Sequence, residues 1–448
     1  MTQDSCETSP AQVPRSNGAK QAGEVRTRWV WTERTVWTDR MLTALERGLK
    51  GGVWFSLIDK VYSMSNLQAA FAKVKANGGA AGCDQQTIAM YETHLEANLE
   101  DLSDQLRRDA YRPRRIRRVY IPKPGGRERR PLGIPTVRDR IVQTALRNVM
   151  EPIFERGFAE HSYGFRPGRG CKDALRRVDG LLEAGYTHVV DVDLKSYFDT
   201  IPHAPLMGRI REKIADGRVL RLIESFLTQS VMDGLDEWTP TAGSPQGAVI
   251  SPLLSNTYLD PLDHEMAKED YEMVRYADDM VVLCRSASEA GQALERVQRW
   301  STNAGLTLHP RKTQIVDANQ EGFDFLGYHF ERGKRWPRDK SLRKLKDAIR
   351  TKTPRKHGCS LSDIIASVNR TTEGWFEYFK HTSYTTVFRS LDGLIRRRLR
   401  RILLKRHRKH DHQGRGFAHY RWPNAYFAAH GLFSMEAAHV RLRQSVVR

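Results

Sequence analysis

MVRYADDMVVL, from Met273 to Leu283, consists of two short apolar runs that meet at a polar tip. This pattern predicts a β-hairpin with Asp278 and Asp279 at or beside its turn. Adjacent exposed carboxylates repel each other, and a divalent cation would neutralise them. The alternative is an ordinary hairpin turn, in which Asp is a common residue. Because Tyr-x-Asp-Asp is short enough to arise by chance, its context has to decide between the two.

A distant segment supplies a third carboxylate. HVVDVDLKSYFDTIPH, from His188 to His203, begins as a strand in which Val190 and Val192 alternate with Asp191 and Asp193. The two aspartates therefore share one face. Two acids on one face suit a metal-binding edge better than a core strand. The alternative, a half-exposed strand with a solvated side, is less favoured beside an acidic hairpin.

A loop punctuated by Pro and Gly lies between these two segments in the sequence. It is SPQGAVISPLLSN, from Ser244 to Asn256, and it runs into an apolar helix. Gly247 allows close backbone approach, and the Gln246 amide both donates and accepts hydrogen bonds. Alone this is an ordinary loop, but its place between two acidic elements predicts a nucleotide-binding role.

The order of these motifs resembles that of the reverse transcriptases encoded by bacterial group II introns. The resemblance extends over roughly residues 55 to 440 and involves many ordered motifs. QGAVISPLLSN favours the group II enzymes over those of retrons and diversity-generating elements. The further matching segments are IPKPGGRERRPLGIP (121–135), PLGIPTVRDRIVQTAL (131–146), HSYGFRPGRG (161–170), GLTLHPRKTQIV (305–316) and FDFLGYHF (323–330).

The resemblance implies an RNA-directed DNA polymerase with three catalytic aspartates. Asp193, Asp278 and Asp279 match the metal-binding positions, with Asp278 as the direct ligand of both metals and Asp279 in support. Asp191 and Asp199 are nearby acids that the family pattern leaves outside the metal site. The implied cofactor is a pair of Mg²⁺ ions, with Mn²⁺ as an alternative. Such ions activate a primer 3′-hydroxyl and stabilise the departing pyrophosphate.

Four residues match the positions that bind the incoming deoxynucleoside triphosphate. Phe198 matches the steric gate, a ring that collides with a ribose 2′-hydroxyl, and Gln246 lines the nucleotide. Lys123 and Arg130 match the residues that grip the triphosphate, although Arg129 beside Arg130 leaves the register of that match open.

Two further matches concern the leaving group and the primer. Lys312, in HPRKT, matches a lysine that protonates the pyrophosphate, and it completes the catalytic set. The segment that holds the primer end is matched by Phe325, Leu326 and Gly327.

The resemblance also implies a fold of class α+β. We expect a right-hand polymerase, with fingers and palm built from antiparallel sheet packed on helices, followed by an α-helical thumb or maturase domain. The expected parts are a flexible N-terminal extension (1–50), fingers with an N-terminal helical extension (51–184), a palm with the catalytic aspartates (185–332), and the thumb or maturase (X) domain with a basic tail (333–448).

Within the last part, Leu361 to Arg406 is predicted to be helical, with an apolar stripe for core packing. Its arginines could form a solvated face, but so many cations without acids favour contact with RNA phosphates. The predicted RNA-binding residues are Arg396, Arg397, Arg400, Arg401, Lys405 and Arg406. No endonuclease segment is recognised after this part, so an enzyme without that domain is expected.

The composition agrees with a polyanionic partner. Lys and Arg number 73 against 53 acids, which gives a formal charge of +20 and a pI near 9.8. Such an excess predicts binding that weakens steeply with salt. No apolar run is long enough to cross a membrane, and the five scattered cysteines suit a reducing compartment. We therefore expect a bacterial cytoplasmic protein, associated with the nucleoid when it acts on DNA, and without a membrane.

The sequence thus predicts a group II intron reverse transcriptase that copies RNA into cDNA and assists RNA splicing and intron mobility as a maturase. Its expected partners are group II intron RNA or another RNA template, a DNA or RNA primer, and deoxynucleoside triphosphates; protein partners stay undefined. Two alternatives are open. One is a domesticated host reverse transcriptase in DNA repair or phage defence, and the other is an RNA-binding splicing cofactor without polymerase activity.

Overall fold

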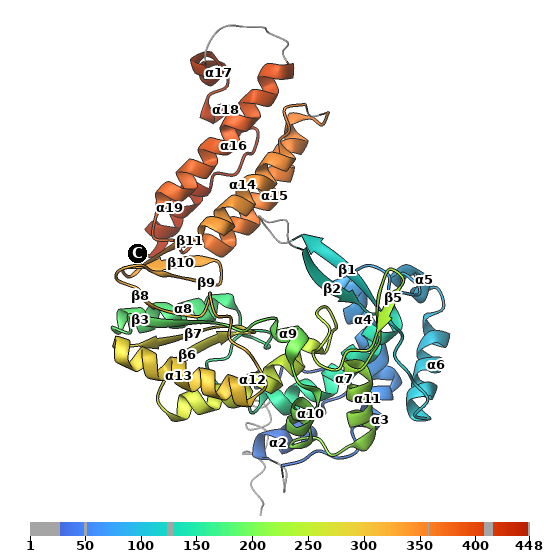
Figure 1. Cartoon of the computed structure of the whole chain (residues 1–448). Helices are drawn as coiled ribbons and strands as arrows, with labels where there is room; N and C mark the ends of the chain where they lie inside the picture. Colours follow the sequence, from blue (N-terminus) through green and yellow to red (C-terminus); the bar gives the residue numbers. More distant parts are fainter. Residues whose placement is uncertain (1–26, 49–51, 123–128, 357, 407–414, 447–448) are drawn as a thin grey trace, which may run out of the picture.

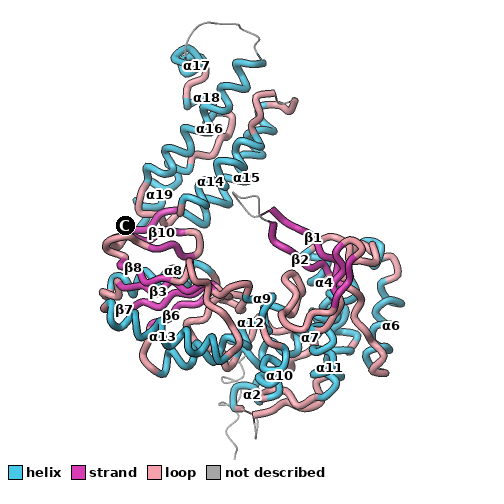
Figure 2. Tube along the Cα trace, viewed as in Figure 1, coloured by secondary structure: helices cyan, strands magenta, loops and turns pink. Residues whose placement is uncertain are grey.

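The computed structural model describes residues 27–48, 52–122, 129–356, 358–406 and 415–446. Two sheets with their helices form the lower part of the molecule, and a group of helices rises from a third, small sheet above them (Figure 1). Figure 2 shows that the strands gather in two separate areas, one at each side of the lower part. Within the described residues, none of the helices has the length and apolar character needed to span a membrane.

The N-terminal helices pack around one long central helix, α7 (Val137–Glu155), which is buried over most of its length. Leu67, Phe71 and Val74 recur at helical spacing in the sequence, which predicts a helix here, and all three are buried on α4. The helices of this part are α2 (Asp39–Arg47), α3 (Ile58–Tyr62), α4 (Met64–Asn77), α5 (Ile88–Glu92) and α6 (Leu95–Arg107). Of these, α3 and α4 pack on α7, α6 packs on α3 and α4, and α5 packs on α6.

Part of the expected flexible extension is ordered. Residues 1–26 lie outside the described residues, but the chain after them packs on the main core. Trp29 and Trp37 are buried there, and Trp37 Nε1 donates to the carbonyl of Asn148 on α7 at 3.0 Å. The expectation of a flexible extension is therefore wrong for residues 27–48, since burying two indoles offsets the cost of ordering this segment.

The first sheet has the strand order β2-β1-β4-β5. β1 pairs antiparallel with β2 and parallel with β4, and β4 and β5 form a short hairpin. The strands are β1 (Ile116–Pro122), β2 (Arg129–Ile134), β4 (Val231–Asp233) and β5 (Asp236–Trp238).

The second sheet, β6-β7-β3-β8, is antiparallel at every pairing. One face, with Val190 and Val192, lies in the core with α12 and α13; the other, with Val189 and Val281, packs with α8 and the small sheet. Its elements are β3 (His188–Asp193), β6 (Glu272–Tyr276), β7 (Asp279–Cys284), β8 (Gln314–Asp317), α8 (Cys171–Glu183), α12 (Ser251–Lys268) and α13 (Ala287–Asn303). Between β3 and α12 lie α9 (Tyr197–Thr200), α10 (His203–Arg211) and α11 (Gly217–Leu227).

The small sheet, β11-β10-β9, joins this part to the C-terminal helices. It extends across the expected boundary at residue 332, because β10 (Tyr328–Glu331) pairs with β11 (Lys334–Pro337) as well as with β9 (Phe323–Phe325). The helices that follow have a core of their own. They are α14 (Asp339–Lys352), α15 (Leu361–Phe379), α16 (Thr385–Arg406), α17 (Arg415–Arg421), α18 (Asn424–Ala429) and α19 (Met435–Val446).

The basic surface predicted on α16 is smaller than expected. Arg397, Arg401, Lys405 and Arg406 are exposed. Arg400 is buried, because its Nε donates to the carbonyl of Trp422 at 2.9 Å and its Nη2 to Asn424 Oδ1 at 2.8 Å. Arg396 is also largely covered and faces Asp392 at 3.9 Å. Arg400 is therefore a structural residue that ties α16 to α18, and its prediction as an RNA-binding residue is wrong.

Candidate active site

The predicted acidic hairpin is confirmed. β6 ends at Tyr276 and β7 begins at Asp279, and these two residues are paired across the ladder. Ala277 and Asp278 form the turn between them. Ala277 has φ of 60°, an uncommon conformation for a residue with a side chain, so the surrounding contacts must hold the turn in place.

A buried arginine holds this turn from behind. Arg275 is fully buried, and its Nη1 donates to the carbonyl of Ala277 and to Asn256 Oδ1, each at 2.9 Å. Its Nε donates to Asp263 Oδ1 at 2.7 Å. Asn256 and Asp263 both belong to α12, so the helix that follows the SPQG loop positions the acidic turn.

The segment before α8 supports the turn from its other side. Tyr163 N–H donates to the carbonyl of Arg275 at 2.8 Å, and Asn256 Nδ2 donates to the carbonyl of Gly164 at 2.8 Å. A Cβ added to Gly164 would overlap the backbone nitrogen of Ala277. Glycine is therefore required here because two backbones meet without room for a side chain.

Four carboxylates lie around the hairpin. Asp193, at the end of β3, pairs across the ladder with Asp279, and Asp191 shares its face. Desolvation together with the charges of Asp279 and Asp193 raises the pKa of Asp191 to about 7. Desolvation and the Asp278 carboxylate raise the pKa of Asp279 to about 6, and desolvation also raises the pKa of Asp278. The carboxylates therefore lie close enough to affect one another's ionisation.

Lys312 reaches the same cluster from the loop before β8. Its Nζ lies 3.0 and 3.2 Å from the two carboxylate oxygens of Asp193. The backbone reinforces this approach, since His309 N–H donates to the carbonyl of Asp193 at 2.7 Å. An ammonium group beside these acids could both neutralise charge and supply a proton.

The donor set fits a Mg²⁺ ion that is completed by a substrate. Mg²⁺ prefers a few carboxylates plus phosphate oxygens to a cage of protein ligands. Asp193, Asp278 and Asp279 could supply such carboxylates. Among the side chains that the structure describes, no group of three His, Cys, Asp or Glu residues is placed to hold a metal ion by itself.

An aromatic cluster adjoins the carboxylates. The ring of Phe198, on α9, lies 6.4 Å from that of Phe165, which in turn lies 6.5 Å from Tyr276 (centroid distances). Phe165 is 42% exposed and has φ of 61°, which is rare for a bulky side chain. Sequence reasoning did not single out Phe165. The feature of the sequence that could have indicated Phe165 is its position directly after Gly164, where the backbone passes close to the hairpin.

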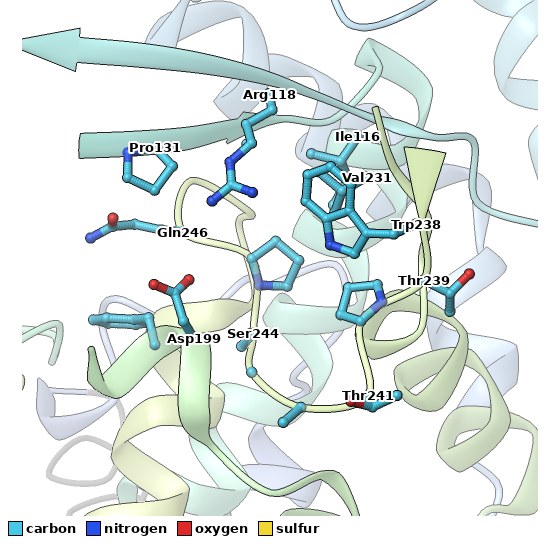
Figure 3. Close-up of a pocket in the computed structure, with 16 residues that line it drawn as sticks. Ile116, Arg118, Pro131, Asp199, Val231, Trp238, Thr239, Thr241, Ser244 and Gln246 are labelled. Carbon is cyan, nitrogen blue, oxygen red and sulfur yellow. The ribbon is translucent and has the colours of Figure 1, made fainter. Parts of the chain in front are cut away.

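The SPQG loop packs directly on the first sheet. Gly133 N–H, on β2, donates to the carbonyl of Gln246 at 2.7 Å. A Cβ at Gly247, where φ is 108°, would overlap the carbonyl oxygen of Gly133. The predicted close backbone approach at Gly247 is confirmed, and its partner is a second glycine. This contact brings Gln246 and Phe198 to the wall of one pocket, whose lining is drawn in Figure 3.

Of the two residues expected to grip the triphosphate, the structure describes only Arg130. Arg130, on β2, is exposed, and its charge acts on Asp278 by lowering the pKa of that carboxyl against the effect of desolvation. Lys123 lies outside the described residues.

The segment expected to hold the primer end forms a tight turn next to Asp279. Leu326 and Gly327 both have positive φ, 46° and 86°, and the backbone N–H of Leu326 lowers the pKa of the Asp279 carboxyl. Tyr378, on α15, donates its hydroxyl to the carbonyl of Leu326 at 2.7 Å. Phe325 points away from the turn into the core, where it is fully buried. This turn therefore connects the acidic site to the C-terminal helices.

Comparison with known families finds a match for two separate parts of the chain. Residues 121–330 match the reverse transcriptase (RNA-dependent DNA polymerase) family. Residues 342–422 match the maturase-specific domain of group II introns. The fold is therefore an α+β reverse transcriptase fold followed by a helical maturase domain, and the first part is an RNA-directed DNA polymerase domain.

Three individual relatives are similar to parts of the chain. The chain is 36% identical to protein YkfC of Escherichia coli (strain K12), over 56% of this chain and 76% of YkfC. It is 38% identical to the group II intron-encoded protein LtrA of Lactococcus lactis subsp. cremoris, over 43% of this chain and 32% of LtrA. It is 30% identical to nuclear intron maturase 2 of Arabidopsis thaliana, over 40% of this chain and 29% of that protein. The chain belongs to the group II intron reverse transcriptase/maturase family.

Proposed function

We propose that this protein copies RNA into complementary DNA and assists the splicing and mobility of a group II intron RNA as a maturase. One observation carries the polymerase proposal: Asp193 and Asp279 face each other on paired strands, with Asp278 at the adjoining turn. Nucleotidyl transfer requires carboxylates grouped in this way. Two bound Mg²⁺ ions, or Mn²⁺ in their place, would lower the pKa of the primer 3′-hydroxyl and stabilise the departing pyrophosphate.

The side chains around the carboxylates have complementary roles in this proposal. Lys312, held against Asp193, gives a proton to the pyrophosphate. Arg130, whose charge lowers the pKa of Asp278, neutralises charge on the triphosphate, and Lys123 is assigned the same role from the sequence. Phe198 excludes a ribose 2′-hydroxyl, while Gln246 lines the base and sugar of the nucleotide.

The parts of the fold acquire polymerase roles accordingly. The β2-β1-β4-β5 sheet with its helices is the fingers, although β4 and β5 come from the range 185–332 that was expected to be palm. The β6-β7-β3-β8 sheet is the palm, and α14–α19 are the thumb and maturase domain (Figure 1). The turn at Leu326 and Gly327 holds the primer end. RNA phosphates are contacted by Arg397, Arg401, Lys405 and Arg406, a role that the net charge of +20 supports.

The test is primer extension on poly(rA)/oligo(dT) with dTTP and Mg²⁺. The wild-type protein should extend the primer, and Asp278→Ala should abolish extension while RNA affinity changes less than about twofold, because the carboxylate is not needed for phosphate contact. Asp59→Ala, which removes an exposed aspartate on α3, is the matched control and should extend normally. Collapse of RNA binding in Asp278→Ala would mean that the residue is structural and would remove the support for the metal site.

The two alternatives give different results. A splicing cofactor without polymerase activity would bind RNA tightly but extend no primer in any form. A domesticated host enzyme would extend primers equally well, so the genomic flanks decide: an intron domain V hairpin downstream of the gene supports mobility, and its absence supports domestication. The presence of Asp193, Asp278, Asp279 and Gln246 together favours an active polymerase over the splicing cofactor.

A further inference from the structure

The turn between β9 and β10 has a backbone conformation that its own sequence does not favour. Leu326 and Gly327 are its two central residues, and both have positive φ, 46° and 86°. A two-residue hairpin turn of this kind favours Gly, Asn or Asp at both positions, because a larger side chain at positive φ crowds its own backbone. Leu326 is therefore strained, and contacts from outside the turn have to hold it in place.

Both carbonyls of the turn accept hydrogen bonds from the C-terminal helices or their edge. Tyr378, on α15, donates its hydroxyl to the carbonyl of Leu326 at 2.7 Å. The carbonyl of Gly327 accepts from the hydroxyl of Ser341, on α14, and from the N–H of Arg338, directly before α14, each at 3.0 Å. In Figure 1, α14 and α15 lie side by side above the small sheet. The conformation of the turn therefore depends on where these two helices lie.

The end of α15 is itself fixed on the small sheet. Tyr328, which is buried on β10, donates its hydroxyl to the carbonyl of Tyr378 at 2.7 Å. The ring of Phe379 packs against the turn, since a Cβ added to Gly327 would lie 3.5 Å from its Cζ. Two tyrosine hydroxyls thus connect α15 to the small sheet at the same distance, but only that of Tyr378 reaches the strained turn.

The same turn adjoins the carboxylates. Desolvation raises the pKa of the Asp279 carboxyl, and the backbone N–H of Leu326 acts against this increase. Leu326 therefore interacts with Asp279 through its N–H and with Tyr378 through its carbonyl. A change in the position of α15 would move this residue relative to the acidic site.

We propose that Tyr378 is a positioning residue for DNA synthesis, whose hydroxyl holds the Leu326–Gly327 turn so that the primer 3′-hydroxyl is aligned with the metal-binding carboxylates. The inference rests on the proposed polymerase function and deepens it. Tyr378 contacts neither substrate nor metal in this assignment and acts only through the turn. Because a small misplacement of the reacting atoms slows a reaction strongly and changes binding little, Tyr378 should affect kcat more than affinity.

The test is primer extension on poly(rA)/oligo(dT) with Tyr378→Phe, which removes only the hydroxyl. Its kcat should fall about five- to tenfold, as expected for the loss of one hydrogen bond that holds the reacting end. The Kd for primer–template and the KM for dTTP should change less than about twofold, because the phosphate contacts and the nucleotide pocket stay intact. The preference for a matched over a mismatched primer end should also decrease, because a mismatched end is already misplaced and loses less.

Tyr328→Phe is the matched control, because it removes a hydroxyl with a hydrogen bond of the same length at the same junction. It should keep kcat within about twofold of the wild type and keep the preference for matched ends. Ser341→Ala should show a smaller loss of the same kind as Tyr378→Phe, because the Gly327 carbonyl keeps the N–H of Arg338. An equal fall of kcat in the two tyrosine variants would overturn the inference, since kcat would then follow the stability of the junction.

The two proposals fail in distinguishable ways. If wild-type protein extends no primer, the polymerase function itself is wrong. If it extends primers normally and Tyr378→Phe, shown by circular dichroism to be folded, extends them as fast, only the role of Tyr378 is wrong. If Tyr378→Phe does not fold, the comparison of Ser341→Ala with Tyr328→Phe decides in the same way.

Discussion

Arg275 and Asp263 form an ion pair that is closed off from solvent directly behind the acidic turn. Their side chains are 0% and 4% exposed, and two donors of the guanidinium reach the two carboxylate oxygens. The remaining donor group binds the carbonyl of Ala277 and Asn256 Oδ1. Because every partner is buried, this pair fixes the position of Asp278 and Asp279 relative to α12.

Removing the acidic partner should be costly. Asp263→Ala leaves the Arg275 guanidinium buried without a counter-charge, so we expect the free energy of unfolding to fall by about 3–5 kcal/mol. Urea denaturation followed by circular dichroism measures this. Glu265→Ala, on the same helix but in a half-exposed pair with Arg296, should cost less than about 1 kcal/mol. Similar losses in the two variants would contradict the role given to the buried pair.

Two adjacent arginines on α16 should behave oppositely. Arg400→Ala removes the buried guanidinium that donates to the carbonyl of Trp422 and to the Asn424 side chain, so thermal stability should fall by several degrees. Arg401→Ala should leave stability unchanged and weaken RNA binding severalfold, because Arg401 is exposed and available to phosphates. Differential scanning fluorimetry and filter binding separate the two effects. A loss of thermal stability in Arg401→Ala together with weaker RNA binding in Arg400→Ala would refute these two roles.

The elements that the sequence predicted well are those fixed by local patterns. The hairpin from Glu272 to Cys284 followed from apolar runs around a polar tip, and α4 followed from its helical spacing. The grouping of Asp193 with Asp279 could be expected only from the resemblance, since 86 residues separate them and nothing local fixes their pairing.

What the sequence did not predict depends on long-range packing. Arg400 has the same local surroundings as Arg401, and only the return of the chain at Trp422 and Asn424 buries it. Phe165 lies in a Gly- and Pro-containing segment, which by itself indicates a surface loop. Its place over the site arises because Gly164 meets the backbone of Ala277, a contact between segments far apart in the sequence.

The carboxylate cluster should make stability depend on pH. The pKa of Asp191, raised to about 7, exceeds its ordinary value of 3.8, so its neutral form is favoured in the folded state. Its contribution is fully present below about pH 4 and is lost as the pH rises toward 7. In EDTA, the Tm of the wild type should therefore fall relative to that of Asp191→Asn as the pH rises from 4 to 8. A constant difference across this range would contradict the raised pKa.

Magnesium should counter this loss. Ionised carboxylates bind the cation and protonated ones do not, so Mg²⁺ should raise the Tm more at pH 8 than at pH 5. The measurement is differential scanning fluorimetry with Mg²⁺ or EDTA at both values. Asp278→Ala should reduce the response at pH 8, while Asp59→Ala, which removes an exposed carboxylate on α3 outside the cluster, should keep it. An equal Mg²⁺ effect in all three proteins would mean that the ion binds elsewhere.

Sugar selectivity should depend on two rings. Phe198→Ala should raise ribonucleotide incorporation, because the ring that collides with the 2′-hydroxyl is removed. Phe165→Ala should do so to a smaller extent, since Phe165 only supports Phe198 through an edge contact at 6.4 Å between centroids. The measurement is the ratio of kcat/KM for dTTP and UTP on poly(rA)/oligo(dT). Phe55→Ala controls for loss of an exposed aromatic ring. Unchanged selectivity in Phe198→Ala would remove it as the gate, and a larger effect at Phe165 would transfer that role to Phe165.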